Sequence, residues 1–285
     1  MQKKTKASIV RLGAVRAHSL TIGPHMHCCR TARTIGDLHS LPFHNRSGAM
    51  RTELGDQQYL LMDDSEIIIL LVYVDDFFLV ASSLEAIYKI KDALDKRFEM
   101  NDLVEAKVLL GLHIRRDKVL GTLKLSQGKY AAHVLKRFGM AECNPIGTPL
   151  GVGMQLIKAD ESDEALPYCE AVGSPMYLMV RTRLDLAFTI GKLIRFVSCY
   201  GKEHWAAIKR VLRFGKGSVV TKLVFDKNSS YVVQGFSCAD WPGHHETRRF
   251  TTGFTFILGG AAVSWGSKLQ KTVALSTTAA AYMAL

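Results

Sequence analysis

The stretch "LLVYVDDFFLV" (residues 70–80) places two adjacent carboxylates, Asp75 and Asp76, inside the most apolar tract of the chain. The β-branched run at 67–74 predicts a strand, the aspartates are typical of a turn, and the apolar residues at 77–81 predict a returning strand. The sequence therefore predicts a β-hairpin with a pair of negative charges at its tip.

Strand and helix patterns follow the hairpin. Ser82 as N-cap and Glu85 three residues later predict a helix whose apolar stripe runs to Phe98. The acidic, aperiodic segment 145–167 indicates a surface linker. The other predicted elements are strands within 108–126, helices at 127–140, 168–180, 184–199 and 203–214, short strands from 219 onward, and the first turns of a helix in the final "STTAAAYMAL".

Composition limits the class of protein. The chain has 285 residues, of which 48% are hydrophobic, so it can form one large or two modest cores. Its formal charge of +11 favours a polyanionic partner such as nucleic acid. Six scattered cysteines without a secretory pattern indicate reduced thiols in a cytoplasmic or nuclear protein, not a secreted one. The apolar tract around the hairpin is too short for a bilayer, so we expect no membrane contact.

The two aspartates need compensation, because adjacent ionised carboxylates repel and burying either one unpaired costs several kcal/mol. A divalent cation supplies it, and hard oxygen ligands on a rigid hairpin suit Mg²⁺ or Mn²⁺. Two such ions can activate a 3′-hydroxyl and stabilise a leaving pyrophosphate. A solvated turn explains the same residues without a metal, because Asp is common in hairpin loops. The spacing alone leaves both readings open.

The four letters YVDD between apolar strands resemble the polymerase signature of reverse transcriptases. Further segments resemble, in consecutive order, the Pol polyprotein of Ty1/copia-type retrotransposons, over about three quarters of the chain. They are "FEMNDLVEAKVLLGLHI", "GTLKLSQGKYAAHVLKRFGM", "TPL", "AVGSPMYLMVRTRLDLAF", "GKEHWAAIKRVLRF", "CADWPG" and "GAAVSWGSKLQKTVALSTTAAAYMAL".

The resemblance implies a catalytic and metal-binding role for Asp75 and Asp76, with Mg²⁺ or Mn²⁺ as the cofactor. It also implies that Tyr73 lies near the nucleotide or primer end. A ribonuclease H-like domain would follow, and the partner would be a primer–template or an RNA–DNA hybrid.

The sequence departs from the family in both catalytic regions. Reverse transcriptases of this kind carry a third metal-binding aspartate upstream, in a stretch resembling "MDVKTAFL", which this chain lacks. In the ribonuclease H-like region Cys238 stands where the family has an aspartate, and a neutral thiol is a poor Mg²⁺ ligand. Ala279 and Ala281 stand where the family has glutamates. We therefore expect no ribonuclease H activity and no polymerase activity from this chain alone.

These features predict an α+β fold, a partial reverse transcriptase palm and connection followed by a truncated ribonuclease H-like α/β domain. The expected domains are an unassigned basic leader at 1–60, the partial palm at 61–150, a helical connection at 151–217 and the ribonuclease H-like domain at 218–285. The chain would be an inactive fragment of Pol. The fingers, which in the family lie upstream and hold the template and incoming nucleotide, are not recognisable in it, and a partner chain would be one source of them. The alternatives are a non-catalytic nucleic-acid-binding protein and a transposon relic without function. Candidate phosphate contacts are Arg115, Arg116, Lys136, Arg137, Lys209 and Arg210.

Overall fold

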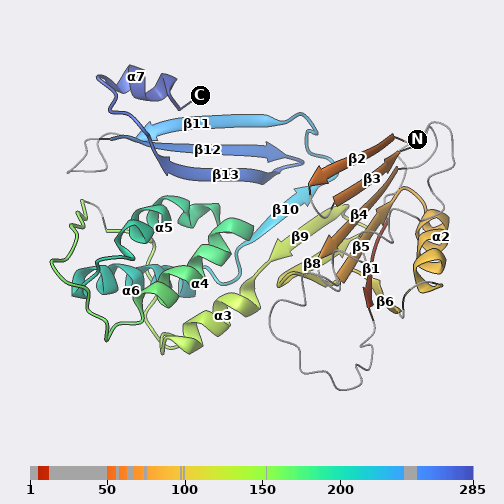
Figure 1. The fold of residues 1–285 in the computed structure, drawn as a ribbon, viewed down its shortest axis with the longest axis horizontal. Coiled ribbons are helices and arrows are strands. Elements are labelled where there is room, and N and C mark those ends of the chain that lie inside the picture. The colour runs from red at the N-terminus through yellow and green to blue at the C-terminus, as the bar shows by residue number, and fades with distance from the viewer. Residues whose placement is uncertain are drawn as a thin grey trace. The chain divides into compact units, whose positions relative to one another are not determined.

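The protein has a mixed α/β fold with several antiparallel sheets (Figure 1). The computed structural model describes residues 6–12, 50–55, 58–62, 67–73, 76–96, 98, 100–151, 153–240 and 249–284, so Asp75 and most of the leader lie outside them. The chain divides into two compact units, residues 1–106 and 107–285. None of the described helices combines the length and apolarity that crossing a bilayer requires.

In its described residues, the first unit consists of a six-stranded sheet and one helix. The strands lie in the order β2-β3-β4-β5-β1-β6, and every pairing recorded between them is antiparallel. The elements are β1 (Lys6–Leu12), β2 (Met50–Gly55), β3 (Gln58–Met62), β4 (Ile67–Tyr73), β5 (Asp76–Ala81), α2 (Leu84–Asp95) and β6 (Met100–Glu105).

The core of this unit lies between the hairpin strands and α2. Alternate residues of β4 and β5 are buried, as period-two side-chain alternation requires. Ile87, Ile90 and Leu94 of α2 pack against them, with Phe98 beside the cluster. The hairpin and the amphipathic helix predicted from the sequence are thus confirmed.

The predicted N-cap of this helix was wrong by one residue. Ser83 is the N-cap, and its hydroxyl accepts a hydrogen bond from the Ala86 amide at 3.1 Å. Ser82 is engaged with β4 instead. Its amide donates to the Ile67 carbonyl at 3.1 Å, and its hydroxyl accepts from the Ile67 amide at 3.3 Å. Ser82 therefore extends the hairpin ladder and has no free hydroxyl for the helix.

One strand of this sheet comes from the predicted leader. β1 lies between β5 and β6 and pairs with both. No pattern in the sequence predicted it, because its partners lie 65 to 97 residues downstream and local periodicity carries no information on such pairing.

The second unit contains two sheets and a helical layer. Its elements are β7 (Val108–Leu109), β8 (Leu112–Asp117), β9 (Thr122–Ser126), α3 (Gly128–Arg137), α4 (Tyr168–Arg181), η2 (Leu184–Leu186), α5 (Ala187–Leu193), η3 (Ile194–Phe196), α6 (Lys202–Gly217), β10 (Lys222–Asp226), β11 (Gln234–Asp240), β12 (Thr251–Leu258), β13 (Ala261–Leu269) and α7 (Thr277–Tyr282). The sheets have the orders β10-β9-β8-β7 and β11-β12-β13.

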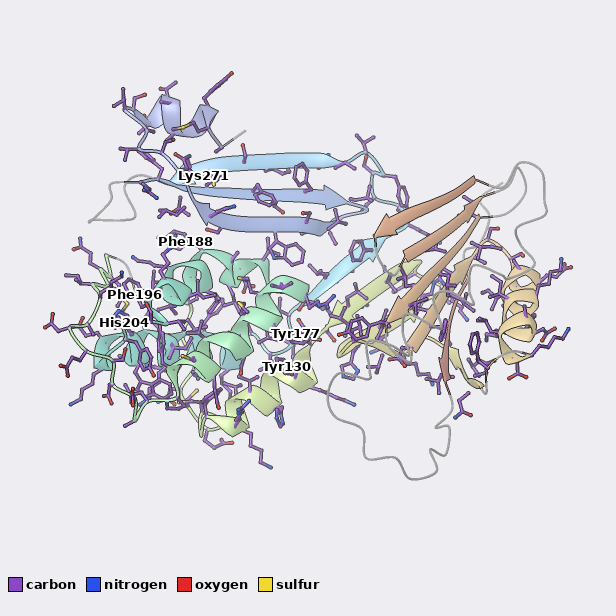
Figure 2. The ribbon with its side chains drawn as sticks, in the orientation of Figure 1. Tyr130, Tyr177, Phe188, Phe196, His204 and Lys271 are labelled. Carbon is purple, nitrogen blue, oxygen red and sulfur yellow. The ribbon has the colours of Figure 1, made fainter. Side chains whose placement is uncertain are left out.

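Aromatic residues organise the helical layer. Tyr168 is fully buried, stacks on Tyr200 with ring centroids 4.8 Å apart, and donates a hydrogen bond to the Leu193 carbonyl at 2.8 Å. In Figure 2 the rings of Tyr130 and Tyr177 lie together where α3 meets α4. The Tyr177 hydroxyl also donates to the Leu110 carbonyl in the β7–β8 turn. The helices and the sheet of β7–β10 therefore pack into one unit.

Candidate active-site hairpin and basic surfaces

The acidic hairpin is formed by β4 and β5. The register pairs Tyr73 at the end of β4 with Asp76 at the start of β5. Tyr73 is half exposed and Asp76 is partly buried. The structure thus brings two of the three predicted residues together as cross-strand neighbours, and the third, Asp75, is not among the described residues.

The row of the sheet that contains Asp76 is mixed in charge. β1 places Arg11 opposite Asp76 on the side away from Tyr73, and β6 places Asn101 opposite Arg11. Residues directly opposite one another share a face of the sheet. Within the described ranges, no group of three or more His, Cys, Asp or Glu residues could hold a metal ion. Asp76 is therefore the single acid described in this row.

The predicted phosphate contacts on β8 point to opposite faces of their sheet. Arg115 is paired with Lys124 of β9, whereas the next residue, Arg116, is paired with Leu123. Both arginines are exposed. The structure therefore places these two candidate phosphate contacts on different faces of the sheet.

The two candidate phosphate contacts on α3 differ in their interactions. Arg137 forms an ion pair with Glu170 of α4, with a nitrogen to oxygen distance of 2.6 Å. Lys136, its neighbour in the sequence, is exposed. The Arg137 guanidinium thus contributes to the contact between α3 and α4.

Most basic residues of helix α6 contact other groups of the same chain. Lys209 lies over the Trp205 ring, with Nζ 5.4 Å from the centroid. Three further cations recur at a spacing of three residues and bind oxygens of the connector at 141–148. Arg210 donates to Thr148 Oγ1 at 2.7 Å, Arg213 donates to the Asn144 carbonyl at 2.8 Å, and Lys216 donates to the Ala141 carbonyl.

The positions expected to be degraded ribonuclease H acids lie on β11 and α7. Cys238 is exposed and pairs with Gly253 of β12. Its neighbour Ala239 contacts the small core of Phe250, Ala274 and Ala280, which includes α7. Because successive strand residues face opposite sides, Cys238 points away from that core. Ala279 borders the core and Ala281 is exposed, so the structure does not bring Cys238 and α7 together.

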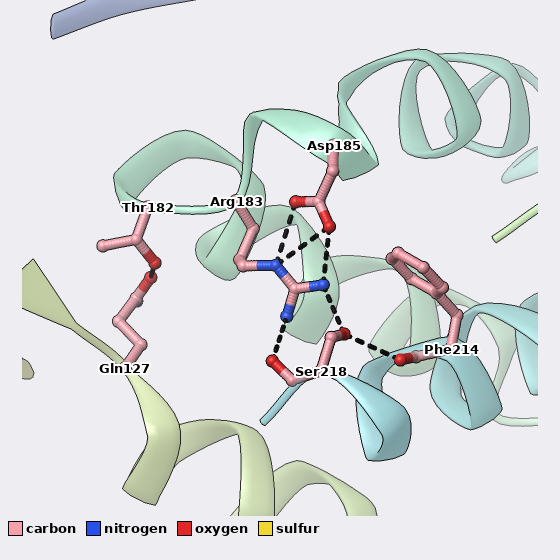
Figure 3. A network of polar contacts seen from close by, with 6 residues as sticks. All are labelled: Gln127, Thr182, Arg183, Asp185, Phe214 and Ser218. Carbon is pink, nitrogen blue, oxygen red and sulfur yellow. Dashed lines mark hydrogen bonds and ion pairs between the residues drawn. The ribbon is translucent and has the colours of Figure 1, made fainter. Parts of the chain in front are cut away.

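A buried polar network was missed by the sequence reasoning (Figure 3). The Arg183 side chain is 3% exposed and forms a two-pronged ion pair with Asp185, at 2.7 Å for the shortest contact. The same guanidinium donates to the carbonyl and hydroxyl oxygens of Ser218 at 3.2 and 2.7 Å. Nearby, Thr182 donates to Gln127 at 2.7 Å. The network joins the ends of α4 and α6 to the start of α3, and no local motif marks it.

His204 is the one fully buried imidazole in the described part of the chain, and Figure 2 places it beside Phe196. Its Nδ1 accepts a hydrogen bond from the Gly201 amide at 3.1 Å, at the start of α6. Burial lowers the pKa of His204, against the nearby Glu203 carboxylate, which raises it. The imidazole therefore packs in the core of the helical layer.

Comparison with known proteins places the chain in a class. A family model described as reverse transcriptase (RNA-dependent DNA polymerase) matches residues 45–152, which include the acidic hairpin. The chain is 35% identical over 217 residues to an uncharacterized mitochondrial protein of Arabidopsis thaliana, an alignment that covers 76% of this chain and 89% of that protein.

Two Pol polyproteins are also similar. The retrovirus-related Pol polyprotein from transposon TNT 1-94 of Nicotiana tabacum is 42% identical over 229 residues, and that from transposon RE2 of Arabidopsis thaliana is 31% identical over 226 residues. These alignments cover 78% and 79% of this chain but 17% and 15% of the polyproteins. The chain belongs to the reverse transcriptase family. Within it, the chain corresponds to a fragment of a copia-type retrotransposon Pol polyprotein, as the sequence predicted.

Proposed function

We propose that the chain is part of a reverse transcriptase palm, from residue 61 to 150, in which Asp75 and Asp76 would hold Mg²⁺ or Mn²⁺ and Tyr73 would lie near the primer end. The observation that carries this proposal is the hairpin register, which sets Tyr73 beside Asp76 at the end of two buried strands within the matched segment. A bound divalent ion would lower the pKa of the attacking hydroxyl and neutralise charge on the leaving group.

We propose further that this chain does not extend a primer by itself. Two-metal chemistry depends on several converging carboxylates. The strand beside β5 supplies Arg11, a cation, opposite Asp76. This register position holds no third acid, so the row offers a metal ion fewer oxygen ligands than two-metal chemistry requires.

Residues 218–285 would be the ribonuclease H-like region, after a helical connection at 151–217. We infer that it does not cleave RNA. Cys238 supplies no hard oxygen ligand, and the α7 positions Ala279 and Ala281 supply none either. The outward direction of Cys238 relative to α7 supports the same inference, because ligands of one ion must converge.

Primer extension tests the polymerase proposal. The full chain is incubated with an RNA template, a labelled DNA primer, all four deoxynucleotides and Mg²⁺ or Mn²⁺. We expect neither primer extension nor shortening of a labelled template in the hybrid. Extension that disappears in Asp76→Ala would overturn the proposed inactivity, whereas RNA cleavage that survives Asp76→Ala would overturn only the inference on ribonuclease H.

A second function, nucleic-acid binding without catalysis, is favoured by how the charge is distributed. Residues 107–285 contain 24 of the 37 Lys and Arg residues but 12 of the 26 Asp and Glu residues, a net charge of +12. Residues 1–106 contain 13 cations and 14 acids. The positive charge of the protein therefore belongs to the unit without the acidic hairpin, where it would attract a polyanion.

A further inference from the structure

One face of the β10-β9-β8-β7 sheet is polar, and the other is apolar apart from Arg116. Directly opposite residues in antiparallel strands project to the same side, so the registers assign each residue to a face. Leu125, Leu223 and Phe225 lie on the apolar face and pack with residues of β13. The other face, called here the basic sheet face, carries on β8–β10 His113, Arg115, Asp117, Thr122, Lys124, Ser126, Lys222, Val224 and Asp226.

Three cations lie close together on this face. Arg115 and Lys124 are directly opposite each other, and Lys222 lies one position diagonally from Lys124. Opposite side chains in a sheet are about 5 Å apart and diagonal ones about 7 to 8 Å apart at Cβ, and like charges at these positions destabilise a sheet. Such a cluster is therefore unfavourable until an anion neutralises it.

The protein itself neutralises the cluster only in part. Hydrogen bonds from the Leu120 and Val119 amides, together with the charges of Lys124 and Arg115, lower the pKa of Asp117. Asp117 thus faces these cations while its oxygen caps the turn that follows β8. Asp226 lies in the same end row and similarly accepts from the Asn228 amide at 2.8 Å. Both acids are at one end of the face.

The cluster is otherwise available to a ligand. Arg115 and Lys222 are exposed, and Lys124 is partly exposed. Among the described residues, no oxygen is hydrogen-bonded or ion-paired to these three side chains. In this respect they differ from the α6 cations, three of which are bound to the connector at 141–148.

We propose that the basic sheet face binds the sugar–phosphate backbone of a double-stranded nucleic acid, an RNA–DNA hybrid in the first place, through Arg115, Lys124 and Lys222. This inference rests on the nucleic-acid-binding function proposed above and assigns the surface that performs it. Thr122 and Ser126 add hydroxyl groups beside the cations, and such groups commonly contact phosphates.

The side chains on the basic sheet face favour a nucleic-acid duplex over a single strand or an anionic lipid surface. It carries no aromatic ring other than the His113 imidazole, and single-stranded nucleic acids are held largely by stacking on aromatic side chains. It also lacks the large apolar residues with which a protein inserts into a lipid surface, Val108 and Val224 being its apolar members. A duplex backbone needs neither feature, and its recognition here is independent of base sequence.

Fluorescence anisotropy of a labelled RNA–DNA hybrid tests the assignment with the full chain. The test variant combines Arg115→Gln, Lys124→Gln and Lys222→Gln. A matched control removes the same charge at exposed lysines elsewhere in the unit, with Lys158→Gln, Lys202→Gln and Lys271→Gln. A third variant, Arg115→Lys with Lys124→Arg and Lys222→Arg, keeps the charge, and thermal melting is recorded for all of them.

We expect the test variant to bind the hybrid at least about tenfold more weakly at physiological salt, with a slope of log affinity against log salt that is shallower by about 2 to 3. The control should change affinity by less than about threefold through net charge alone. The charge-keeping variant should bind like the parent protein, which separates a lost contact from a damaged fold.

Four outcomes would overturn the assignment. Equal loss in the test and control variants would mean that net charge alone attracts the hybrid, and normal binding by the test variant would move the surface elsewhere. Both of these results leave the proposed binding function intact. If the parent protein binds no hybrid, the proposed binding function is overturned as well. Tighter binding to single-stranded RNA, or to phosphatidylserine vesicles, than to the hybrid would identify a different ligand.

Discussion

Helix α6 carries five Lys and Arg residues and the basic sheet face carries three, but the two surfaces of this unit use their cations differently. On α6 four of the five cations contact a ring or an oxygen of the same chain. On the sheet face they meet one another and two acids at one end. A basic residue that is already bound contributes to stability, whereas one held beside like charges is poised for an external anion. The sequence alone does not distinguish these cases.

Arg183 is the extreme case of a bound cation, and its loss should have the largest effect. Arg183→Met leaves Asp185 and the Ser218 oxygens without their donor. We expect the free energy of unfolding of the second unit to fall by about 2 to 3 kcal/mol, because the Ser218 oxygens lose their charged donor while Asp185, which is 37% exposed, is solvated instead. Urea unfolding followed by tryptophan fluorescence measures it, because all three tryptophans lie in residues 107–285.

The matched control for this prediction is Arg115→Met on the sheet face. Removing an arginine that forms no hydrogen bond or ion pair within the described residues should change the unfolding free energy by less than about 0.5 kcal/mol. A loss as large as that of Arg183→Met would erase the distinction between bound and available cations on which the comparison depends.

The sequence predicted the parts of the fold that depend on local pattern. The hairpin followed from alternation in 67–81, and α2 from apolar residues at helical spacing. The N-cap was misplaced because Ser82 and Ser83 are equally good caps and only the ladder contact to Ile67 decides between them.

The parts that depend on contacts distant in the sequence were not predictable. β1 joins the hairpin from more than sixty residues away, and with it Arg11 reaches the register position opposite Asp76. The Arg183 network draws on Gln127 and Ser218, each more than thirty residues from the arginine. The candidate site was therefore found by its motif, while the groups around it required the tertiary fold.

His204 carries a smaller effect that depends on pH. Burial lowers its folded-state pKa below the ordinary value of 6.5, so the unfolded chain binds the proton more readily. Stability from this group is therefore complete above pH 6.5 and is lost as pH falls toward the folded-state pKa. We expect the unfolding free energy of the second unit to decrease over this window, as measured by urea titrations at several pH values.

His204→Asn provides the control, because asparagine can still accept a hydrogen bond from the Gly201 amide but does not titrate. We expect it to cost about 1 kcal/mol at neutral pH, for the altered cap and packing, and to flatten the dependence of stability on pH below 6.5. An unchanged slope in this variant would assign the acid sensitivity to other groups.

Lys209 should give the smallest change, and it tests the comparison at its weakest point. Its ammonium lies over the Trp205 ring rather than against an oxygen, so it is the least firmly bound cation of α6. An exposed cation–π contact is worth about 0.5 to 1 kcal/mol. Lys209→Gln should therefore lower the unfolding free energy by about that amount and leave hybrid binding within about twofold of the parent.

The control is Lys202→Gln, at an exposed lysine at the start of the same helix, and it should change neither the unfolding free energy nor hybrid binding. If Lys209→Gln instead weakened hybrid binding as much as a single substitution on the basic sheet face, α6 would belong to the nucleic-acid surface. A cation in contact with an aromatic ring would then still be able to bind a phosphate.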